Sequence, residues 1–339
     1  MYESFYGLTA KPFQLKPDPS FYFGSKGHKR AMAYLEYGLS QGEGFIVITG
    51  EVGAGKTTLV RNLFRELDSD KILAAQIVNT HLNSDDTLRM VASAFGLQFE
   101  GATKASLLTR IEEFFRQCDM RGQRALLVVD EAQNLSPQTV EELRMLSNFQ
   151  TDDKSLLQTF LLGQPEFRKT LLSPEMLQLR QRVIATYHLG PMDAEETRTY
   201  IEHRLHTVGW SGNPSISDEA FAEIHTFTGG IPRKINTLCD RLFLMGYLEE
   251  LYAFSVAEVR EVTKDIEREF DVPPEADQDG LLPMREFSAS LVDQPRIDLD
   301  IMDERLSRIE RSVVSVLDAL RKILSSPRMK NQSNERDLP

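Results

Sequence analysis

The sequence of 339 residues is poor in cysteine and tryptophan and has no long apolar run. The two cysteines, Cys118 and Cys239, lie far apart and outside any CxxC or Cys–His spacing, which indicates buried thiols and not a disulfide framework or a metal site. No run approaches the roughly 20 apolar residues of a membrane-spanning helix, and the first residues lack the basic and apolar regions of a signal peptide. We therefore expect a cytoplasmic protein with no membrane span of its own, for which a partner is the only route to a membrane.

Positive charge is also scarce. The chain has 39 lysines and arginines against 51 aspartates and glutamates, a formal net charge of −12. Neutralising the phosphates of a nucleic acid requires clustered lysine and arginine. The composition argues against a passive nucleic-acid binder, although a local basic face remains open.

Five short apolar runs alternate with amphipathic segments in the first part of the chain. Continuous Val/Ile/Leu runs between helices predict a parallel sheet covered on both faces, an α/β fold. Residues 193–268 instead show helix caps and helical spacing, which predict a helical module. The expected strands are 44–50, 71–79, 124–131, 156–164 and 182–190. The expected divisions are a core with an N-terminal arm (1–190), a helical lid (191–268), a linker (269–298), a helix (299–325) and a disordered tail (326–339).

The helix expected after the acidic, proline-rich linker carries a heptad pattern. Apolar residues recur at spacings of three and four, which favours a coiled coil with itself or with a partner; a single helix docked on the body is the alternative. The seam consists of Leu299, Met302, Leu306, Ile309, Val313, Val316, Leu320 and Ile323.

The segment "GEVGAGKT" matches the phosphate-binding pattern G-x-x-x-x-G-K-[ST] between an expected strand and an expected helix. The glycines let several backbone N–H groups face one anion, and the helix N-terminus adds partial positive charge. We expect Lys56 to reach the β- and γ-phosphates and Thr57 to hold Mg²⁺. The nucleotide-binding candidates are Gly50, Glu51, Val52, Gly53, Ala54, Gly55, Lys56, Thr57 and Thr58.

A second acidic site follows the run "ALLVVDEAQNL". Asp130 would complete the Mg²⁺ site, and Glu131 would polarise an attacking water as general base. A helix-terminal charge is the alternative for Glu131. Since a small-molecule kinase does not need this glutamate, its presence favours hydrolysis. A helicase is disfavoured because no second lobe or paired-arginine motif is present.

The order of these features resembles that of the AAA+ ATPases. The resemblance assigns Gln164 as the polar sensor beside the γ-phosphate, Arg233 as the lid arginine, and Asn79 as the residue that restrains the catalytic glutamate. It assigns Arg182, or Arg180 two residues earlier, to a neighbouring subunit's nucleotide. A strand-end turn, a surface arginine and a helix cap are the alternatives for Gln164, Arg182 and Asn79.

Longer segments resemble the general secretion pathway protein A family over residues 1 to 268, and most of all its secretion ATPases found with the exosortase and PEP-CTERM sorting system. The matching segments include the N-terminus, "DEAQNL", "LLGQPEFRKTL", "LRQRV" and "GGIPRKIN". The resemblance implies that the segment from Phe13 to Phe23 lies against adenine; core packing is the alternative. The membrane span and peptidoglycan-binding domain of the secretion-type members are not expected here, so cell-wall contact is not carried over.

Two classes of function fit these features. The first is an ATP- and Mg²⁺-dependent ATPase that forms an ATP-dependent homo-oligomer and powers or regulates assembly of an envelope export system linked to exopolysaccharide, with an unidentified export-system protein as partner. The alternative is a nucleotide-gated adaptor on DNA, resembling the transposition-regulator ATPases. The acidic charge disfavours this alternative.

Overall fold

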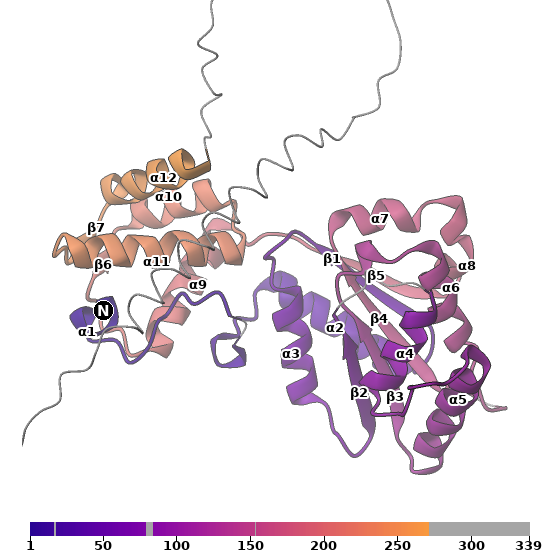
Figure 1. Ribbon diagram of the computed structural model, residues 1–339. Helices are drawn as coiled ribbons and strands as arrows, with labels where there is room; N and C mark the ends of the chain where they lie inside the picture. The colour runs from indigo at the N-terminus through magenta and orange to yellow at the C-terminus, as the bar shows by residue number, and fades with distance from the viewer. Residues whose placement is uncertain (17, 79–83, 153, 271–339) are drawn as a thin grey trace, which may run out of the picture. The chain divides into compact units, whose positions relative to one another are not determined.

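The computed structural model describes residues 1–16, 18–78, 84–152 and 154–270 (Figure 1). Its centre is a five-stranded parallel sheet in the order β2-β3-β4-β1-β5. The strands are β1 (Phe45–Gly50), β2 (Ile72–Ile77), β3 (Arg124–Val129), β4 (Leu157–Gly163) and β5 (Val183–Leu189). The sequence prediction of five parallel strands is confirmed, with each strand inside its expected range.

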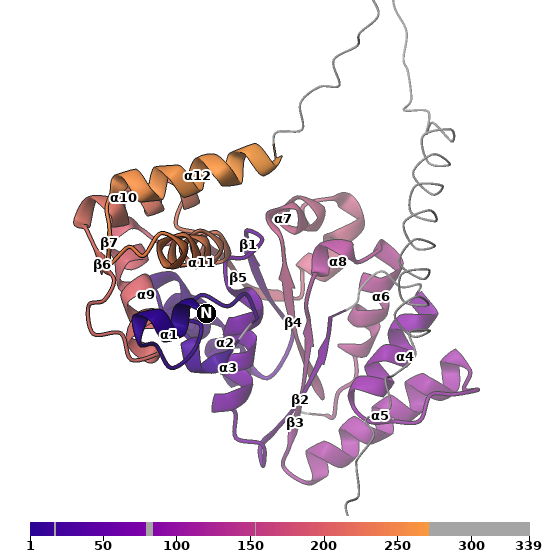
Figure 2. The ribbon, with the colours of Figure 1, turned by 60° about the vertical axis from the view of Figure 1, so that its left-hand side comes forward.

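Helices cover both faces of the sheet, as the continuous apolar runs require. On one face Val47 of β1 packs with α4 to α8, and on the other Ile48 of the same strand packs with α2 and α3 (Figures 1 and 2). Successive side chains of a strand point to opposite faces, so both sets of a strand are apolar. These helices are α2 (Lys26–Gln41), α3 (Lys56–Glu66), α4 (Ser84–Ala94), α5 (Lys104–Met120), α6 (Pro137–Leu146), α7 (Pro165–Leu171) and α8 (Leu177–Arg180), with 3-10 turns η2 (Ala132–Asn134) and η3 (Pro174–Met176).

The lid follows β5 and contains four helices. Asp193 and Glu196 form a capping box at its first helix, and Gly229 ends the second in the left-handed conformation. The lid also has a two-stranded parallel pair that the expectation of an all-helical module missed, because each strand is two residues long. The elements are α9 (Ala194–Thr207), β6 (Ser215–Ile216), α10 (Asp218–Thr228), α11 (Pro232–Leu248), β7 (Ala253–Phe254) and α12 (Val256–Phe270).

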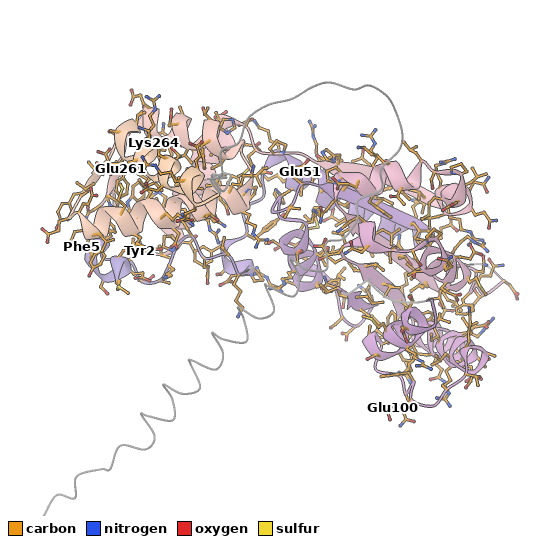
Figure 3. All side chains as sticks on the ribbon, turned by 45° about the horizontal axis from the view of Figure 1, so that its top comes forward. Tyr2, Phe5, Glu51, Glu100, Glu261 and Lys264 are labelled. Carbon is orange, nitrogen blue, oxygen red and sulfur yellow. The ribbon has the colours of Figure 1, made fainter. Side chains whose placement is uncertain are left out.

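The N-terminal arm, residues 1–25 with α1 (Tyr2–Tyr6) and η1 (Pro19–Phe21), packs into the lid. The Tyr6 hydroxyl donates to the Leu251 carbonyl at 2.9 Å, and the ring of Phe13 lies 5.5 Å from that of Phe243. Figure 3 shows labelled Phe5 of the arm close to the lid helices, where its ring meets that of Tyr247. The buried side chains of the arm therefore belong to the lid core and not to the sheet core.

Several expectations fall on residues outside the described ranges. They are Asn79, almost all of the linker, the heptad helix 299–325 and the tail 326–339. Within the described ranges, no helix combines the length and apolarity needed to cross a membrane.

Candidate functional site

The glycine-rich loop connects the end of β1 to the start of α3. Gly53 and Gly55 have φ of +83° and +99°, in the left-handed region that glycine adopts readily. A Cβ on Gly50 would lie 2.7 Å from the Leu189 carbonyl oxygen, so this position also excludes a side chain. The loop is thereby held in a tight curve that ends at the N-terminus of α3, the geometry expected of a phosphate cradle.

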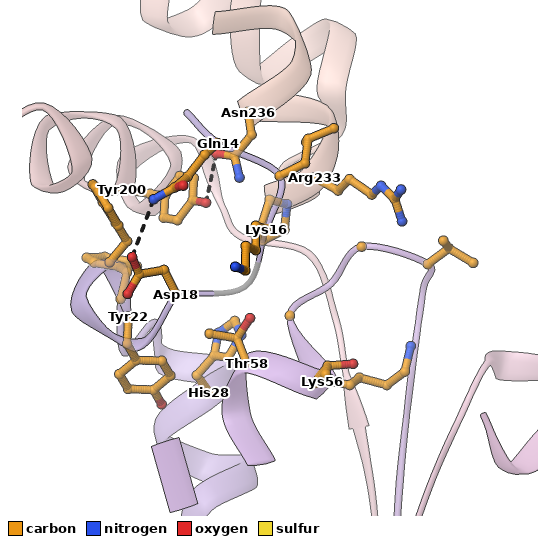
Figure 4. A pocket seen from close by; sticks show the side chains of 18 of the residues that line it. Gln14, Lys16, Asp18, Tyr22, His28, Lys56, Thr58, Tyr200, Arg233 and Asn236 are labelled. Carbon is orange, nitrogen blue, oxygen red and sulfur yellow. Dashed lines mark hydrogen bonds between the residues drawn. The ribbon is translucent and has the colours of Figure 1, made fainter. Parts of the chain in front are cut away.

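Lys56, the first residue of α3, is only 8% exposed. Its Nζ donates to the carbonyl oxygens of Gly50 at 2.6 Å and Glu51 at 3.0 Å. Burial lowers the pKa of Lys56, and the carboxylates of Glu131 and Asp130 oppose that shift. The loop thus encloses the ammonium of Lys56 (Figure 4), whose charge the two carboxylates of the neighbouring strand end favour.

Asp130 follows β3 and is 1% exposed. Its Oδ2 accepts the Thr57 hydroxyl at 2.9 Å, and its Oδ1 accepts the Glu131 backbone N–H at 3.0 Å. Burial raises the pKa of Asp130, while these hydrogen bonds oppose the shift. A hydroxyl and a buried carboxylate in contact are the oxygen donors that Mg²⁺ prefers, and they lie beside the loop that would hold the phosphates. The residues present therefore fit a nucleotide with Mg²⁺.

Glu131 has a left-handed backbone, with φ of +54°. Two glutamine amides approach its Oε2: Nε2 of Gln133 at 2.6 Å and Nε2 of Gln164 at 3.4 Å. The sequence prediction placed Gln164 here, but it missed Gln133. The available signal was the position of Gln133 two residues after the glutamate, within the same quoted motif.

Arg233 begins α11 and brings the lid to the loop. Its backbone N–H donates to the Gly53 carbonyl at 3.2 Å, and its exposed side chain lines the same cavity as Lys56 (Figure 4). The structure thus brings together Lys56, Thr57, Asp130, Glu131 and Gln164 in the core and Arg233 in the lid.

Arg182 lies at the amino-terminal ends of the strands, opposite the end where Lys56 lies. It directly precedes β5, whose first residue pairs with the start of β1, whereas Lys56 follows the end of β1. Its Nη1 donates to Ser147 Oγ at 2.9 Å, and its Nη2 contacts Asn148 Oδ1. Arg180 donates to the Leu171 carbonyl at 3.0 Å. Neither arginine joins the site of its own chain, so the trans role remains a prediction.

A cavity of about 370 Å³ extends from the loop toward the lid. Its far end is walled by the arm, within the segment from Phe13 to Phe23 that the family resemblance placed against adenine, and by α9 and α11, where sequence patterns suggested only packing. The walls there include Phe21, Tyr22, Phe23, Tyr200, Arg204 and Asn236. Aromatic faces of this kind suit a nucleobase. Phe13, the first residue of the segment expected against adenine, is instead buried in the lid core.

Polar side chains at the far end form a hydrogen-bonded chain. Arg204 Nη1 donates to the Tyr200 hydroxyl at 2.9 Å, and that hydroxyl donates to Asn236 Oδ1 at 2.9 Å (Figure 4). Because the Asn236 oxygen is engaged, its NH₂ group is the part of the amide available to a ligand. Burial lowers the pKa of His28 to about 4, and a hydrogen bond to the Ala54 backbone opposes this shift. His28 is therefore neutral beside the loop.

The chain is similar to known proteins in sequence and fold. Residues 39–171 match the family model described as AAA domain. General secretion pathway protein A of Aeromonas hydrophila is 39% identical over 248 residues, which cover 73% of this chain and 45% of that protein. The match therefore spans less than half of the relative's length.

Solved structures resemble the fold at low sequence identity. The Aeropyrum pernix ORC2 protein, in ADPNP–ADP complexes, has a TM-score of 0.57 at 16% identity, covering 75% of this chain and 71% of its own. Cdc6p from Pyrobaculum aerophilum has a TM-score of 0.57 at 18% identity, covering 77% of this chain and 74% of its own. The predicted AAA+ fold is confirmed, and the chain is similar to General secretion pathway protein A over most of its own length.

Proposed function

We propose that the protein binds ATP with Mg²⁺ and hydrolyses it to power or regulate assembly of an envelope export system. The single observation that carries the catalytic part is the convergence of Lys56, the Thr57–Asp130 pair and Glu131 at one end of the cavity. Mg²⁺, when bound, would neutralise charge on the phosphate oxygens. Thr57 and Asp130 would hold the ion, and Lys56 would contact the β- and γ-phosphates.

Glu131 would act on the water. Its carboxylate accepts a proton from a water whose oxygen bonds to the γ-phosphorus, the bond from that phosphorus to the bridging oxygen breaks, and ADP leaves. Arg233 would approach the phosphates from the lid. Its backbone contact with Gly53 supports this role, because it fixes the start of α11 against the loop.

The test compares Glu131→Gln with the wild-type chain. ATP turnover should fall by about 100-fold or more, the usual contribution of a general base, while binding of a fluorescent ATP analogue persists. Glu175→Gln is the matched control, because Glu175 is exposed on η3 and lies outside the cavity lining. Unchanged turnover in Glu131→Gln would overturn the assignment.

The hydrolytic site would be shared between copies, with Arg182 acting on a neighbour. In that case, mixing Arg182→Ala chains with Lys56→Ala chains should restore part of the turnover that each lacks alone. Absence of any recovery would contradict a trans site. Light scattering after size exclusion, with and without ATP, would show whether the nucleotide drives assembly, and a chain truncated after residue 270 would show whether the heptad segment contributes.

Similarity to General secretion pathway protein A over 73% of this chain supports the export role. The finer proposal is an export system of the exosortase and PEP-CTERM type, linked to exopolysaccharide. Cells that carry only the Lys56→Ala chain should lose export of that polymer or of the sorted proteins. Normal export would refute this role, and turnover stimulated by DNA at physiological salt would favour the adaptor alternative.

A further inference from the structure

Gln133 joins two neighbouring strand ends through one side chain. It lies in η2, the single turn that follows Glu131 after β3. Its Nε2 donates to Glu131 Oε2 at 2.6 Å, and its Oε1 accepts the backbone N–H of Gln164 at 3.0 Å. Since Gln164 follows β4, which pairs with β3, the amide bridges the two adjacent strands at the edge where the candidate site lies.

The backbone contact fixes which way the amide faces. A backbone N–H can only donate, so the atom of Gln133 facing Gln164 is the oxygen, and the NH₂ group faces Glu131. The turn around it is closely packed, with Ala132 and Phe167 each 0% exposed. Gln133 is therefore a preset donor aimed at one carboxylate oxygen.

Gln133 and Gln164 differ in how closely their side chains approach Glu131 Oε2. The Gln164 side chain approaches the same oxygen at 3.4 Å, a long contact, while the Gln133 contact has the short separation typical of a charge-assisted hydrogen bond. Glu131 also has a left-handed backbone, which allows its side chain to meet a partner two residues later. The near contact to the carboxylate thus comes from the residue that the sequence prediction overlooked.

We propose that Gln133 is a positioning residue for hydrolysis: it orients the Glu131 carboxylate toward the attacking water and ties that orientation to the end of β4 through Gln164. The inference rests on the proposed function, because it assumes that Glu131 is the general base. A purely structural role, in which Gln133 only joins η2 to the start of α7, would change stability without acting through Glu131.

The first experiment is Gln133→Glu in the full chain. The new side chain has the same shape and keeps an oxygen for the Gln164 N–H, but it replaces the donor facing Glu131 with an acceptor. Hydrogen bonds to charged groups contribute about 1.5–3 kcal/mol, so kcat should fall by roughly 10- to 100-fold. KM and the affinity for a fluorescent ATP analogue should stay within about 3-fold of the wild-type values, a difference of less than 1 kcal/mol, because the change affects the orientation of Glu131 and not nucleotide binding. Gln138→Glu, the same change at an exposed position of α6, is the control and should leave kcat unchanged.

The second experiment tests whether the effect passes through Glu131. Gln133→Ala should lower single-turnover hydrolysis in the wild-type chain but not in the Glu131→Gln chain, where the oriented carboxylate is already gone. An equal loss in both backgrounds would assign a structural role and overturn the inference. If the wild-type chain hydrolyses ATP and Gln133→Glu has the same kcat, this inference is overturned but the proposed function stands. A wild-type chain without turnover would overturn the proposed function, and this inference with it.

Discussion

Gly53 of the phosphate loop lies in close contact with Arg233 at the start of the lid helix α11. A Cβ built on Gly53 would lie 2.3 Å from the Cβ of Arg233 and 3.1 Å from its Cδ. The Cβ of Arg233 is fixed to the backbone of α11 and cannot rotate away. We therefore expect Gly53→Ala to push the start of the lid helix off the loop.

The size of the effect follows from two terms. Gly53 has φ of +83°, and a left-handed conformation costs a residue with a side chain roughly 1–2 kcal/mol. Restoring an ordinary separation of 3.4 Å requires a shift of about 1.1 Å (3.4 − 2.3), which would break the 3.2 Å hydrogen bond from the Arg233 N–H to the Gly53 carbonyl. That bond contributes about 1 kcal/mol, so the free energy of unfolding should fall by about 2–3 kcal/mol.

Chemical denaturation measures the loss of unfolding free energy, and ATP-analogue binding measures the displacement of the lid helix from the phosphate loop. Gly96→Ala is the matched control, because Gly96 has φ of +75° with nothing within 4 Å of its built Cβ and therefore reports the backbone cost alone. Arg233→Ala keeps the obstructing Cβ and should not rescue Gly53→Ala, whereas Arg233→Gly should. The reasoning is refuted if Gly53→Ala and Gly96→Ala lose equal stability and ATP affinity is unchanged in both.

Three further outcomes are expected. Thr57→Val removes the hydroxyl beside Asp130, so the magnesium concentration needed for ATP binding should rise by about 10-fold. Thr57→Ser keeps the hydroxyl and should need the wild-type concentration. Equal magnesium titrations of the two variants would contradict the site. His28 has a pKa of about 4 in the folded chain against about 6.5 unfolded, so the unfolded state binds its proton first as the pH falls. Relative to His28→Gln, the wild type should lose about 3 kcal/mol of stability between pH 6.5 and 4, measured by denaturation, and parallel pH profiles would exclude this. Tyr200→Phe breaks the hydrogen bond that orients Asn236 and should weaken ATP binding by about 5-fold, or roughly 1 kcal/mol. Unchanged affinity by calorimetry would show that Asn236 does not contact the nucleobase at the far end of the cavity.

The sheet was predictable because every strand is mostly apolar, and β1 and the buried part of β3 are apolar on both faces. Neighbouring residues such as Ile46 and Val47 face opposite sides of β1, and both sides are covered by helices, so both must be apolar. The phosphate loop was equally visible because its chemistry lies in eight consecutive residues, from Gly50 to Thr57. Local backbone geometry alone determines such a site.

At the far end of the cavity, only the arm segment from Phe13 to Phe23 was expected near a nucleotide; the walls from α9 and α11 were not predictable, because they come from segments separated in sequence. Tyr200 and Asn236 belong to different helices, and each reads as an ordinary member of an amphipathic pattern. Arg204 is 4% exposed although arginine is rarely buried; its charge lies over the ring of Phe21 at 4.9 Å. The packing of α9 against α11, and of the arm against both, brings these side chains together, and no pattern within any one segment specifies that packing.

That packing also constrains the order in which the chain can fold during synthesis. The hydroxyl of Tyr2 donates to Asp240, 238 positions later, so the first aromatic side chains to leave the ribosome have no native partner until the lid has been made. At about 5–20 residues per second, this interval lasts roughly ten seconds or more. Contacts of such long sequence separation carry a large loop-closure entropy and form late. The sheet can therefore assemble first, and the lid core is completed only when the oldest part of the nascent chain returns to it.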